Sequence, residues 1–392
     1  MAPLSRRALF TGALAAAAFG DGAVAPGAAP AMERLDADAV RFEIDPGGHI
    51  FVQATLMGRA VAALVDSGAA ATVLDRTFAT ALGLPAASAE EAAGLTDRLV
   101  VTGVRLPAIS VGGHRMPATS GHVLDLSSVS ASLGRQVDLV LGQDLLAGSS
   151  VMLDFESRTM SFEPAGAALK RGYARLDLRA SPHGRLYLPV SIEDGPPVEA
   201  MYDLGSNVPV YVSGDYARAR GLLAARKVSK SATVGAEGLA ISQIATLRTL
   251  SIGGFTLRDV PVQAPERWNQ TAPVLIGAPV WRRFSNIIDL DHRRLDLKPE
   301  PQAFARPFQK DRSGIGADRL ADRLRIVFVA PGSPAAAAGL QAGDEILRID
   351  GVRVDEAFYA ARPRPGAESA GTTERLTLAS GRVAEIRLAD YF

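Results

Sequence analysis

The sequence contains no cysteine, and its positive and negative side chains balance. Without cysteine there is no disulfide, no thiol nucleophile, no thiolate zinc site and no attachment point for a cysteine-linked lipid. Lys and Arg together number 42, as do Asp and Glu, so the formal net charge is zero. Because a nucleic-acid-binding surface needs a basic excess, this balance argues against a nucleic acid as a partner.

Histidine is also scarce, and its spacing predicts no metal site. The five histidines are scattered along the chain, at His49, His114, His122, His183 and His292. None has the spacing of a metal-binding motif or the setting of a catalytic triad. A trypsin-like enzyme would need a Gly-x-Ser-Gly-Gly segment, which the residues around Ser67 do not form. Glycine-rich phosphate-binding loops are missing too, so we expect no metal and no cofactor.

Residues 1–31 are predicted to be an export signal. Arg6 and Arg7 precede a mildly apolar stretch, and small residues follow with Ala-x-Ala segments at 23–25 and 29–31. Pro26 would directly follow the first of these, so we favour cleavage after Ala31. This pattern is typical of a bacterial twin-arginine signal and predicts a periplasmic protein; the alternative is a disordered tail rich in Ala and Gly. No later stretch reaches about 18 uncharged apolar residues, so no integral membrane segment is predicted after signal removal.

The middle of the chain contains an internal repeat. Three segments recur about 135 residues later in the same order. They are residues 64–68 and 201–205, residues 139–142 and 274–277, and residues 153–155 and 288–290. A near-constant offset at three markers indicates a duplicated unit of roughly 125 residues. We place the two units at residues 40–165 and 175–300.

Each unit is predicted to be mostly β-structure. The matched runs 49–56 and 185–192 alternate between apolar and polar residues, and Gly-Gly pairs at 112–113 and 253–254 predict hairpin turns. Short helices are expected near 76–82, 143–147, 216–222 and 279–284. After a linker at 299–311, residues 312–392 change in character. A strand at 324–329, a turn and short helix at 331–340, and a hairpin around Asp350-Gly351 predict a small α+β domain.

The first repeated segment carries one aspartate in each unit. Asp66 and Asp203 each follow an apolar run, and Gly68 and Gly205 follow two residues after them. Two carboxyl groups that lie close together share one proton, because both cannot ionise comfortably. The ionised group can then act as a base toward a water molecule and the protonated group as an acid. Glycine beside each aspartate would let the two loops approach closely.

These motifs resemble those of the retropepsin-like and pepsin-like aspartyl protease family of bacteria, over roughly residues 40 to 300. The resemblance implies two acid-protease β-barrel lobes in one mainly β chain. It implies an aspartic endopeptidase that cleaves peptides or unfolded proteins with the catalytic pair Asp66 and Asp203. The supporting residues would be Ser67, Gly68, Gly205 and Ser206. Asp154 and Asp289 also repeat, but their neighbours favour strand ends over catalysis.

The second unit departs from the family pattern. The family carries a hydroxyl directly after each aspartate, which hydrogen-bonds across to the partner loop. Ser67 stands there in the first unit, whereas Leu204 stands there in the second. The alternative function is therefore a catalytically impaired pseudoprotease that binds peptides in the bacterial envelope.

The family covers its substrate with hairpin flaps. By position, the candidate flap residues are Gly94 in the first unit and Gly235, Glu237 and Gly238 in the second. Glycine-rich tips suit a mobile lid, although ordinary hairpin turns would look the same.

Residues 312–392 resemble a PDZ domain. The resemblance rests on the Gly-Ser-Pro-Ala-Ala-x-Ala-Gly-Leu run at 332–340, followed by Gly-Asp-x-Ile-Leu-x-Ile-Asp-Gly at 343–351. Such domains take a protein C-terminus as an added strand and hold its carboxylate with backbone N–H groups. The candidate carboxylate-binding loop is Gly314, Ile315, Gly316 and Ala317. The alternative is an internal docking module that binds no free peptide.

Overall fold

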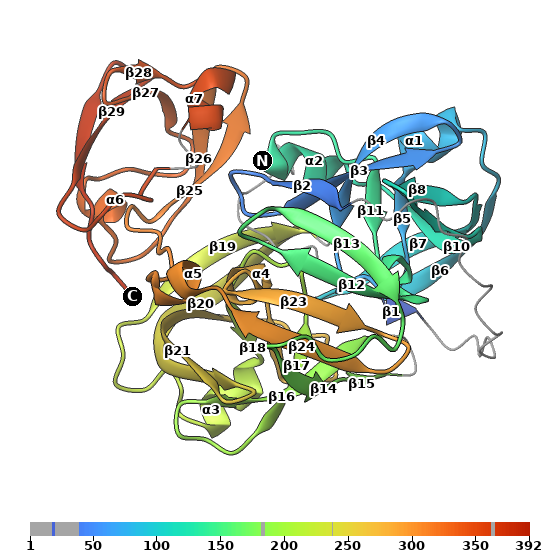
Figure 1. Cartoon of the computed structure of the whole chain (residues 1–392). Helices are drawn as coiled ribbons and strands as arrows, with labels where there is room; N and C mark the ends of the chain where they lie inside the picture. The colour runs from blue at the N-terminus through green and yellow to red at the C-terminus, as the bar shows by residue number, and fades with distance from the viewer. Residues whose placement is uncertain (1–17, 20–38, 182–184, 237, 362–364) are drawn as a thin grey trace.

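The computed structural model describes residues 18–19, 39–181, 185–236, 238–361 and 365–392. It contains two β-rich lobes and a smaller C-terminal domain, coloured orange to red in Figure 1. The predicted fold class, mainly β with two acid-protease lobes and a PDZ domain, is confirmed. The domain bounds deduced from the sequence stay predictions.

The first lobe is a set of strands with three short helices. Its strands are β2 (Val40–Ile44), β3 (Ile50–Leu56), β4 (Arg59–Val65), β5 (Val73–Asp75), β6 (Ala86–Ala93), β7 (Arg98–Leu106), β8 (Ile109–Val111), β9 (His114–Met116), β10 (Thr119–Leu124), β11 (Leu139–Leu141), β12 (Ser149–Asp154) and β13 (Thr159–Pro164). Its helices are α1 (Arg76–Ala81), α2 (Ser127–Leu133) and the 3-10 helix η1 (Gln143–Leu146). A further strand, β1 (Ala18–Phe19), pairs with β6; the rest of the predicted export signal lies outside the described residues.

The second lobe repeats this plan. Its strands are β14 (Ala174–Asp177), β15 (Arg179–Ala180), β16 (Leu186–Ile192), β17 (Val198–Tyr202), β18 (Val210–Val212), β19 (Ser229–Gly235), β20 (Gly238–Ile252), β21 (Phe255–Pro265), β22 (Val274–Ile276), β23 (Phe284–Asp289) and β24 (Arg294–Pro299), with helices α3 (Gly214–Ala219) and α4 (Ala278–Trp281). The expected short helices in both lobes are therefore present, within a few residues of their predicted bounds. The Gly-Gly turns lie between β8 and β9 and between β20 and β21.

The C-terminal domain has its own sheet. Its elements are β25 (Ile315–Leu320), β26 (Arg323–Val329), α6 (Pro334–Ala337), β27 (Glu345–Ile349), β28 (Val352–Arg353), α7 (Glu356–Ala361), β29 (Thr373–Leu378) and β30 (Val383–Arg387). Its buried side chains form a core separate from the one that the two lobes share. The segment predicted as a linker from its content of Pro, Gln and charged residues contains α5 (Pro301–Ala305), which begins with a proline, a residue well tolerated at the start of a helix.

Strand pairing shows the duplication directly. In the first lobe β4 runs parallel to β11, with Leu64 beside Val140. In the second lobe β17 runs parallel to β22, with Met201 beside Leu275. The two strands that end at the aspartates are thus paired with the two apolar segments that end in glycine, in the same register.

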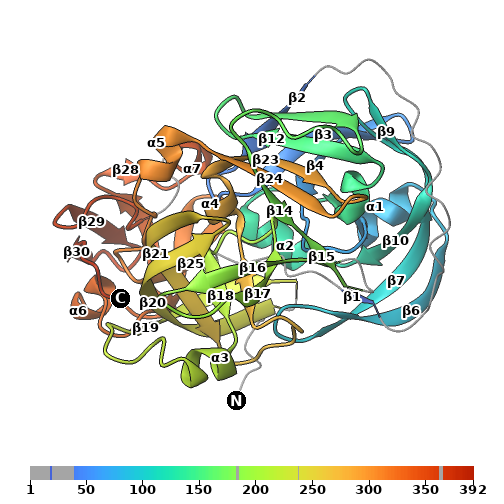
Figure 2. The same ribbon diagram turned by 60° about the horizontal axis from the view of Figure 1, so that its bottom comes forward.

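A shared sheet joins the lobes. β12 pairs with β13 on one side and with β23 of the second lobe on the other, and β23 pairs with β24. The paired strands cross the middle of the molecule in Figures 1 and 2. Backbone ladders therefore fix the two halves relative to each other, as a rigid frame for residues placed between them.

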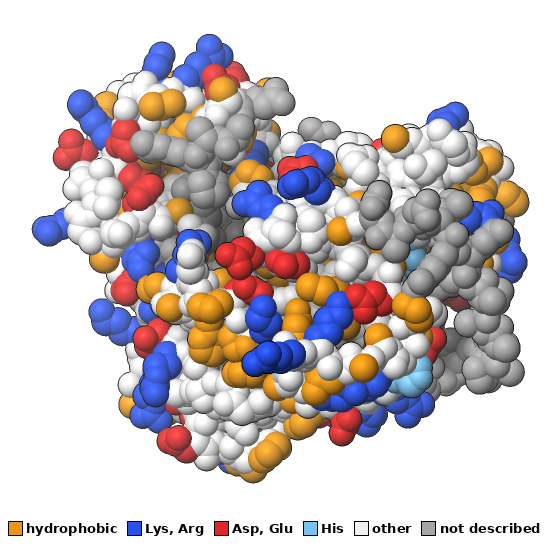
Figure 3. Space-filling model, viewed as in Figure 1, with side chains coloured by type: hydrophobic (Ala, Val, Ile, Leu, Met, Phe, Trp, Pro, Cys, Tyr) orange, Lys and Arg blue, Asp and Glu red, His pale blue; other side chains and the backbone are white. Residues whose placement is uncertain are grey.

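On the face shown in Figure 3, acidic and basic side chains are interspersed, as the zero formal net charge suggests. Among the described residues, no helix combines the length and the apolar character that crossing a bilayer would require.

Candidate active site

Asp66 and Asp203 stand at matching places, one residue beyond β4 and β17. The backbone N–H of Asp66 donates to the carbonyl of Leu141 at 2.9 Å, and that of Asp203 donates to the carbonyl of Ile276 at 3.1 Å. The parallel strand beside each aspartate therefore fixes where its backbone leaves the sheet. Both side chains are fully buried between the lobes.

The two loops cross so that each glycine packs on the carboxyl group of the opposite lobe. A Cβ built on Gly68 would lie 2.8 Å from Cγ of Asp203, and one built on Gly205 would lie 2.3 Å from Cγ of Asp66. Real Cβ atoms do not approach other atoms so closely, so only glycine fits at either place. The structure thus brings Asp66 and Asp203 together across the lobe interface.

Each carboxyl group is oriented by its own loop. Oδ1 of Asp66 accepts from the N–H groups of Gly68 at 2.8 Å and Ala69 at 3.2 Å. Oδ1 of Asp203 accepts from those of Gly205 at 2.8 Å and Ser206 at 3.1 Å. The two Oδ2 atoms are buried and have no fixed donor among the described residues. When the pair holds one proton, a carboxyl–carboxyl hydrogen bond can satisfy them.

Burial raises the pKa of both aspartates. Burial, followed by the negative charge of Asp203, raises the pKa of Asp66 well above the ordinary value of 3.8. Burial raises the pKa of Asp203 to about 6, while the N–H groups of its loop and the positive charge of Arg185 work in the opposite direction. Because the two carboxyl groups are coupled, the pair loses its protons in two steps that belong to both residues together.

Among the described residues, one hydroxyl bridges the two loops. Oγ of Ser67 accepts from the N–H of Leu204 at 2.9 Å and donates to the carbonyl of Tyr202 at 3.5 Å. The side chain of Leu204 is buried in the core shared by the lobes and provides no reciprocal bond. Ser206 contributes its N–H to Asp203, but its hydroxyl bonds the backbone of Val208, within its own loop.

Sequence reasoning missed a second polar support in the first lobe. Nε2 of Gln143 donates to the carbonyl of Ser67 at 2.8 Å. The neighbouring Asp144 accepts from the hydroxyl of Thr72 at 2.7 Å and from its N–H at 3.0 Å. Both residues directly follow the glycine of the second repeat marker, a position where polar residues signal a contact with the aspartate loop. The matching residues of the second lobe are Ala278 and Pro279, which cannot make these bonds.

The candidate flap residues lie at hairpin tips. Gly94 lies between β6 and β7, where its N–H donates to the carbonyl of Asp97 at 2.8 Å. Gly235 and Gly238 face each other at the end of the β19–β20 hairpin, and Glu237 lies outside the described residues. The tip of the first hairpin reaches the second lobe, where Leu95 packs with Tyr187 and Met201. The β6–β7 hairpin therefore contacts the second lobe, and its role as a flap stays a prediction.

In the C-terminal domain, two N–H groups of the candidate carboxylate-binding loop already have partners. Gly314 donates to Oδ2 of Asp311 at 3.0 Å, and Ile315 donates to Oγ of Ser313 at 3.1 Å. Gly316 and Ala317 belong to β25, which pairs only with β26 in the described sheet. The other edge of β25 is the one to which a peptide strand could add.

Two protein-family models match parts of the chain. Residues 52–145 and 188–280 each match the aspartyl protease family, and residues 325–360 match the PDZ domain family. Among solved structures, the chain is similar to Basic 7S globulin from soybean, with 12% identity, a TM-score of 0.41, and coverage of 67% of this chain and 95% of that one. No curated protein matches the chain.

The two crossed loops, each with an aspartate and a glycine, define the class of two-lobed acid-protease folds. This chain belongs to the aspartyl protease family, with both lobes in one chain and a PDZ domain at the C-terminal end.

Proposed function

We propose that this protein is an aspartic endopeptidase that activates a water molecule between Asp66 and Asp203. The observation that carries the proposal is the crossed packing of Gly68 on Asp203 and of Gly205 on Asp66. This packing serves no obvious purpose for stability, since two buried carboxyl groups face each other at a cost in free energy. Strongly perturbed carboxyl pairs of this kind are typical of catalytic sites.

We assign the role of base to Asp203, because the positive charge of Arg185 favours its ionised form. Ionised Asp203 accepts a proton from water while the water oxygen attacks the peptide carbonyl carbon. Protonated Asp66 donates to the carbonyl oxygen, which gives an intermediate with two hydroxyl groups on one carbon. As the C–N bond breaks, Asp203 passes its new proton to the leaving nitrogen and Asp66 takes back a proton from one of these hydroxyls, so the pair ends as it began. Because both carboxyl groups are fully buried, the hairpin that ends at Gly94 must open before a substrate can enter.

Asp66→Asn tests the proposal, with Asp154→Asn as the matched control. Oδ1 of Asp154 accepts from the N–H groups two and three residues later, at 3.0 and 2.9 Å, as Oδ1 of Asp66 does, but Asp154 lies outside the cleft. The readout is cleavage of an unfolded protein and a peptide library from pH 4 to pH 8. We expect Asp66→Asn to abolish cleavage and Asp154→Asn to retain it. Equal cleavage by wild type and Asp66→Asn would refute the dyad.

A second candidate function is peptide binding without cleavage. Leu204, which replaces the second bridging hydroxyl, favours it. In that case wild type and Asp66→Asn would bind peptides from the same library, and neither would cleave them at any pH.

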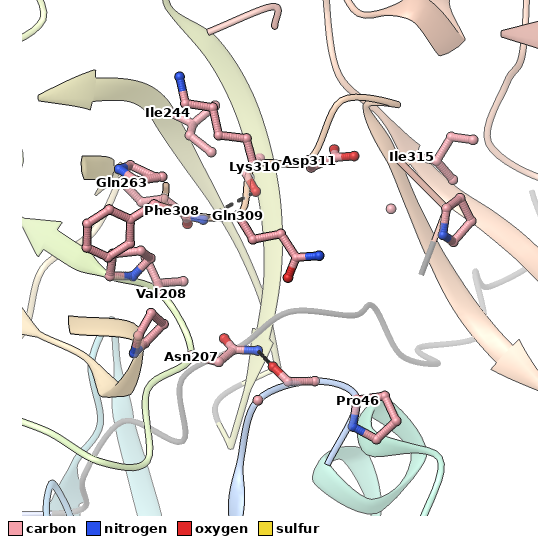
Figure 4. A pocket seen from close by; sticks show the side chains of 18 of the residues that line it. Pro46, Asn207, Val208, Ile244, Gln263, Phe308, Gln309, Lys310, Asp311 and Ile315 are labelled. Carbon is pink, nitrogen blue, oxygen red and sulfur yellow. Dashed lines mark hydrogen bonds between the residues drawn. The ribbon is translucent and has the colours of Figure 1, made fainter. Parts of the chain in front are cut away.

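We also propose that the PDZ domain docks a peptide, as substrate or as a protein C-terminus. A cavity of about 600 Å³ lies where both lobes, the linker and the PDZ domain meet. Figure 4 shows Pro46, Asn207, Lys310 and Ile315 around it, each from a different one of these parts. A peptide added to β25 would therefore lie next to the lobes. Replacing Ile315 with Glu should weaken the binding of apolar peptides, measured by fluorescence anisotropy in Asp66→Asn protein.

The sequence-based expectation of export completes the proposal. A twin-arginine signal would deliver the folded enzyme to the periplasm. The test is Arg6→Lys together with Arg7→Lys, which should leave the uncleaved precursor inside the cell.

A further inference from the structure

Arg185 is a buried cation close to the aspartate pair. It stands directly before β16, and only 4% of its surface is exposed. Its backbone is fixed by Ser181, whose N–H donates to the carbonyl of Arg185 at 2.8 Å and whose Oγ accepts from the N–H of Arg185 at 3.1 Å. β16 runs antiparallel to β17 with Tyr187 opposite Met201, and this register, continued by two residues, places Arg185 opposite Asp203. A buried guanidinium is costly, so its location calls for a role.

A two-step hydrogen-bond relay links Arg185 to the tip of the first-lobe hairpin. Nη1 of Arg185 donates to Oε1 of Gln270, and Nε2 of Gln270 donates to the carbonyl of Gly94. A guanidinium can only donate, so it must face the amide oxygen of Gln270. The amide nitrogen then points at Gly94. Arg185 thus sets the orientation that lets Gln270 hold the hairpin.

The same loop of the second lobe holds the rest of the tip. The N–H of Asn269 donates to the carbonyl of Leu95 at 2.8 Å, and its Nδ2 donates to the carbonyl of Asp97 at 3.0 Å. Arg267 pairs with the carboxylate of Asp97 at 2.8 Å. Leu95 is 5% exposed, among apolar residues of the second lobe. Closure therefore combines apolar burial with a directed set of polar bonds.

The first lobe has a different residue at the matching place. His49 precedes β3 as Arg185 precedes β16, and its Nδ1 lies 3.2 Å from a carboxylate oxygen of Asp45. At the tip of the second hairpin, Ala236 packs against apolar residues of the first lobe. Among the described residues, therefore, the second lobe has a cation that contacts a hairpin tip and lies near the aspartate pair, and the first lobe has no equivalent.

We propose that Arg185 is a positioning residue: through Gln270 it latches the β6–β7 hairpin closed, and it places a fixed positive charge beside Asp203. The latch stands independently of catalysis, whereas its effect on turnover rests on the proposed peptidase function. Closing the lid and favouring the ionised form of Asp203 would then depend on one side chain.

Few charged or titratable groups of the described residues face Asp203. They are Asp66, Arg185 and Tyr202, with Tyr187 beside Arg185. Burial raises the pKa of Tyr202 well above its ordinary value, so this phenol stays neutral. Removing the charge of Arg185 raises the pH at which Asp203 loses its proton. The acid limb of any pH profile that reports this step should move to higher pH.

Hydrogen exchange at residues 94–97 tests the latch without any assay of cleavage. The variants are Arg185→Gln and Gln270→Ala, and the control is Arg226→Gln. Arg226 bonds Glu193, which directly follows the other end of β16. At ~3.3 Å per strand residue, Glu193 lies roughly 25 Å from Arg185. We expect exchange at these residues to be about tenfold faster in both test variants, the effect of losing one to two hydrogen bonds. In the control, exchange should stay at the wild-type rate. Exchange as in wild type in folded Gln270→Ala would overturn the latch.

The charge effect is read from the carboxyl carbon shifts of ¹³C-labelled aspartate between pH 4 and pH 9. Asp203 should titrate at higher pH in Arg185→Gln, but near the wild-type pH in Arg185→Lys and Gln270→Ala, which keep the charge. Cleavage profiles of kcat/KM should follow the same order. Unchanged titration in Arg185→Gln would overturn this half of the proposal. An inactive wild type would refute the peptidase function alone, since exchange and titration need no turnover.

Discussion

The two lobes share a backbone frame and differ in the polar residues placed on it. Strand register around Asp66 and around Asp203 is the same, and each aspartate accepts hydrogen bonds from the N–H groups two and three residues later in its own loop. The first lobe adds a bridging hydroxyl and the amide of Gln143, whereas the second adds the cation Arg185. A duplicated frame can therefore divide one site's supports between its copies, and neither lobe alone carries the complete set.

Both lobes have a glycine at the matching position beside the opposite aspartate, and replacing these glycines should have the largest effect on activity. In Gly205→Ala the new methyl group would overlap the carboxyl group of Asp66 at 2.3 Å. In Gly68→Ala the overlap with Asp203 is milder, at 2.8 Å. We expect Gly205→Ala to lower kcat/KM by about 100-fold or more, because a displacement of ~1 Å in a reacting group has that effect. Gly68→Ala should lower it less.

The matched control is Gly103→Ala in β7. A methyl group there would meet its nearest neighbour at 3.5 Å, an ordinary contact. Steady-state kinetics and thermal unfolding of the three variants separate a displaced carboxyl group from general instability. If Gly68→Ala were the more damaging variant, the crossed packing would not explain the site.

The lobes differ in the hydroxyl that bridges the loops, which the first lobe has in Ser67 and the second lacks. Ser67→Ala would remove the acceptor of the buried N–H of Leu204. Leaving a buried donor unsatisfied costs about 1–3 kcal/mol, so we expect a loss of that size in the free energy of unfolding, measured by urea titration. Activity should fall too, since the loop that holds Asp203 loses its tie to the first lobe.

The reciprocal variant, Leu204→Ser, tests how much stability the second lobe gains from having leucine where the family has a hydroxyl residue. Leu204 is 1% exposed, so the change removes a buried apolar side chain and costs about 2–5 kcal/mol. If the variant had the same free energy of unfolding as wild type, the new hydroxyl would compensate for the lost packing. The leucine side chain would then not be required for the core.

Sequence reasoning anticipated the parts of the molecule that repeat. The offset of the markers around Asp66 and Asp203 predicted two lobes, and apolar alternation with Gly-Gly turns predicted most strands. These features depend on local spacing and backbone conformation. Because the unit is duplicated, one sequence shows the same local pattern in two copies.

The supports that do not repeat could not be anticipated. Arg185 lies 85 residues from Gln270, and Gln270 lies 176 residues from Gly94, so nothing local signals their contact. The signal in the sequence was the mismatch itself, because Arg185 and His49 occupy the same place in the aligned units. A buried charge at one copy of a repeated position marks an added role that the other copy lacks.

The last repeated pair, Asp154 and Asp289, should show the smallest difference, and one that depends on pH. Asp154 caps its own turn, whereas buried Asp289 accepts from Arg294 at 2.7 Å, Gly166 at 2.7 Å and, across the lobes, Ser150 at 2.9 Å. Despite burial, these bonds hold the pKa of Asp289 well below its ordinary value. We expect Asp289→Asn to lower the free energy of unfolding by about 1–2 kcal/mol at pH 7, and Asp154→Asn by about 0.5.

The sign of the pH dependence follows from the lowered pKa of Asp289. The stability that the carboxylate contributes is fully present above the unfolded-state pKa of about 4, and it is lost as the pH falls through the folded-state pKa. Urea titrations at pH 7, 4 and 3 should therefore show the gap between wild type and Asp289→Asn shrinking below about pH 4. A gap that stayed constant to pH 3 would mean that packing, and not the ionised carboxylate, is what Asp289 adds between the lobes.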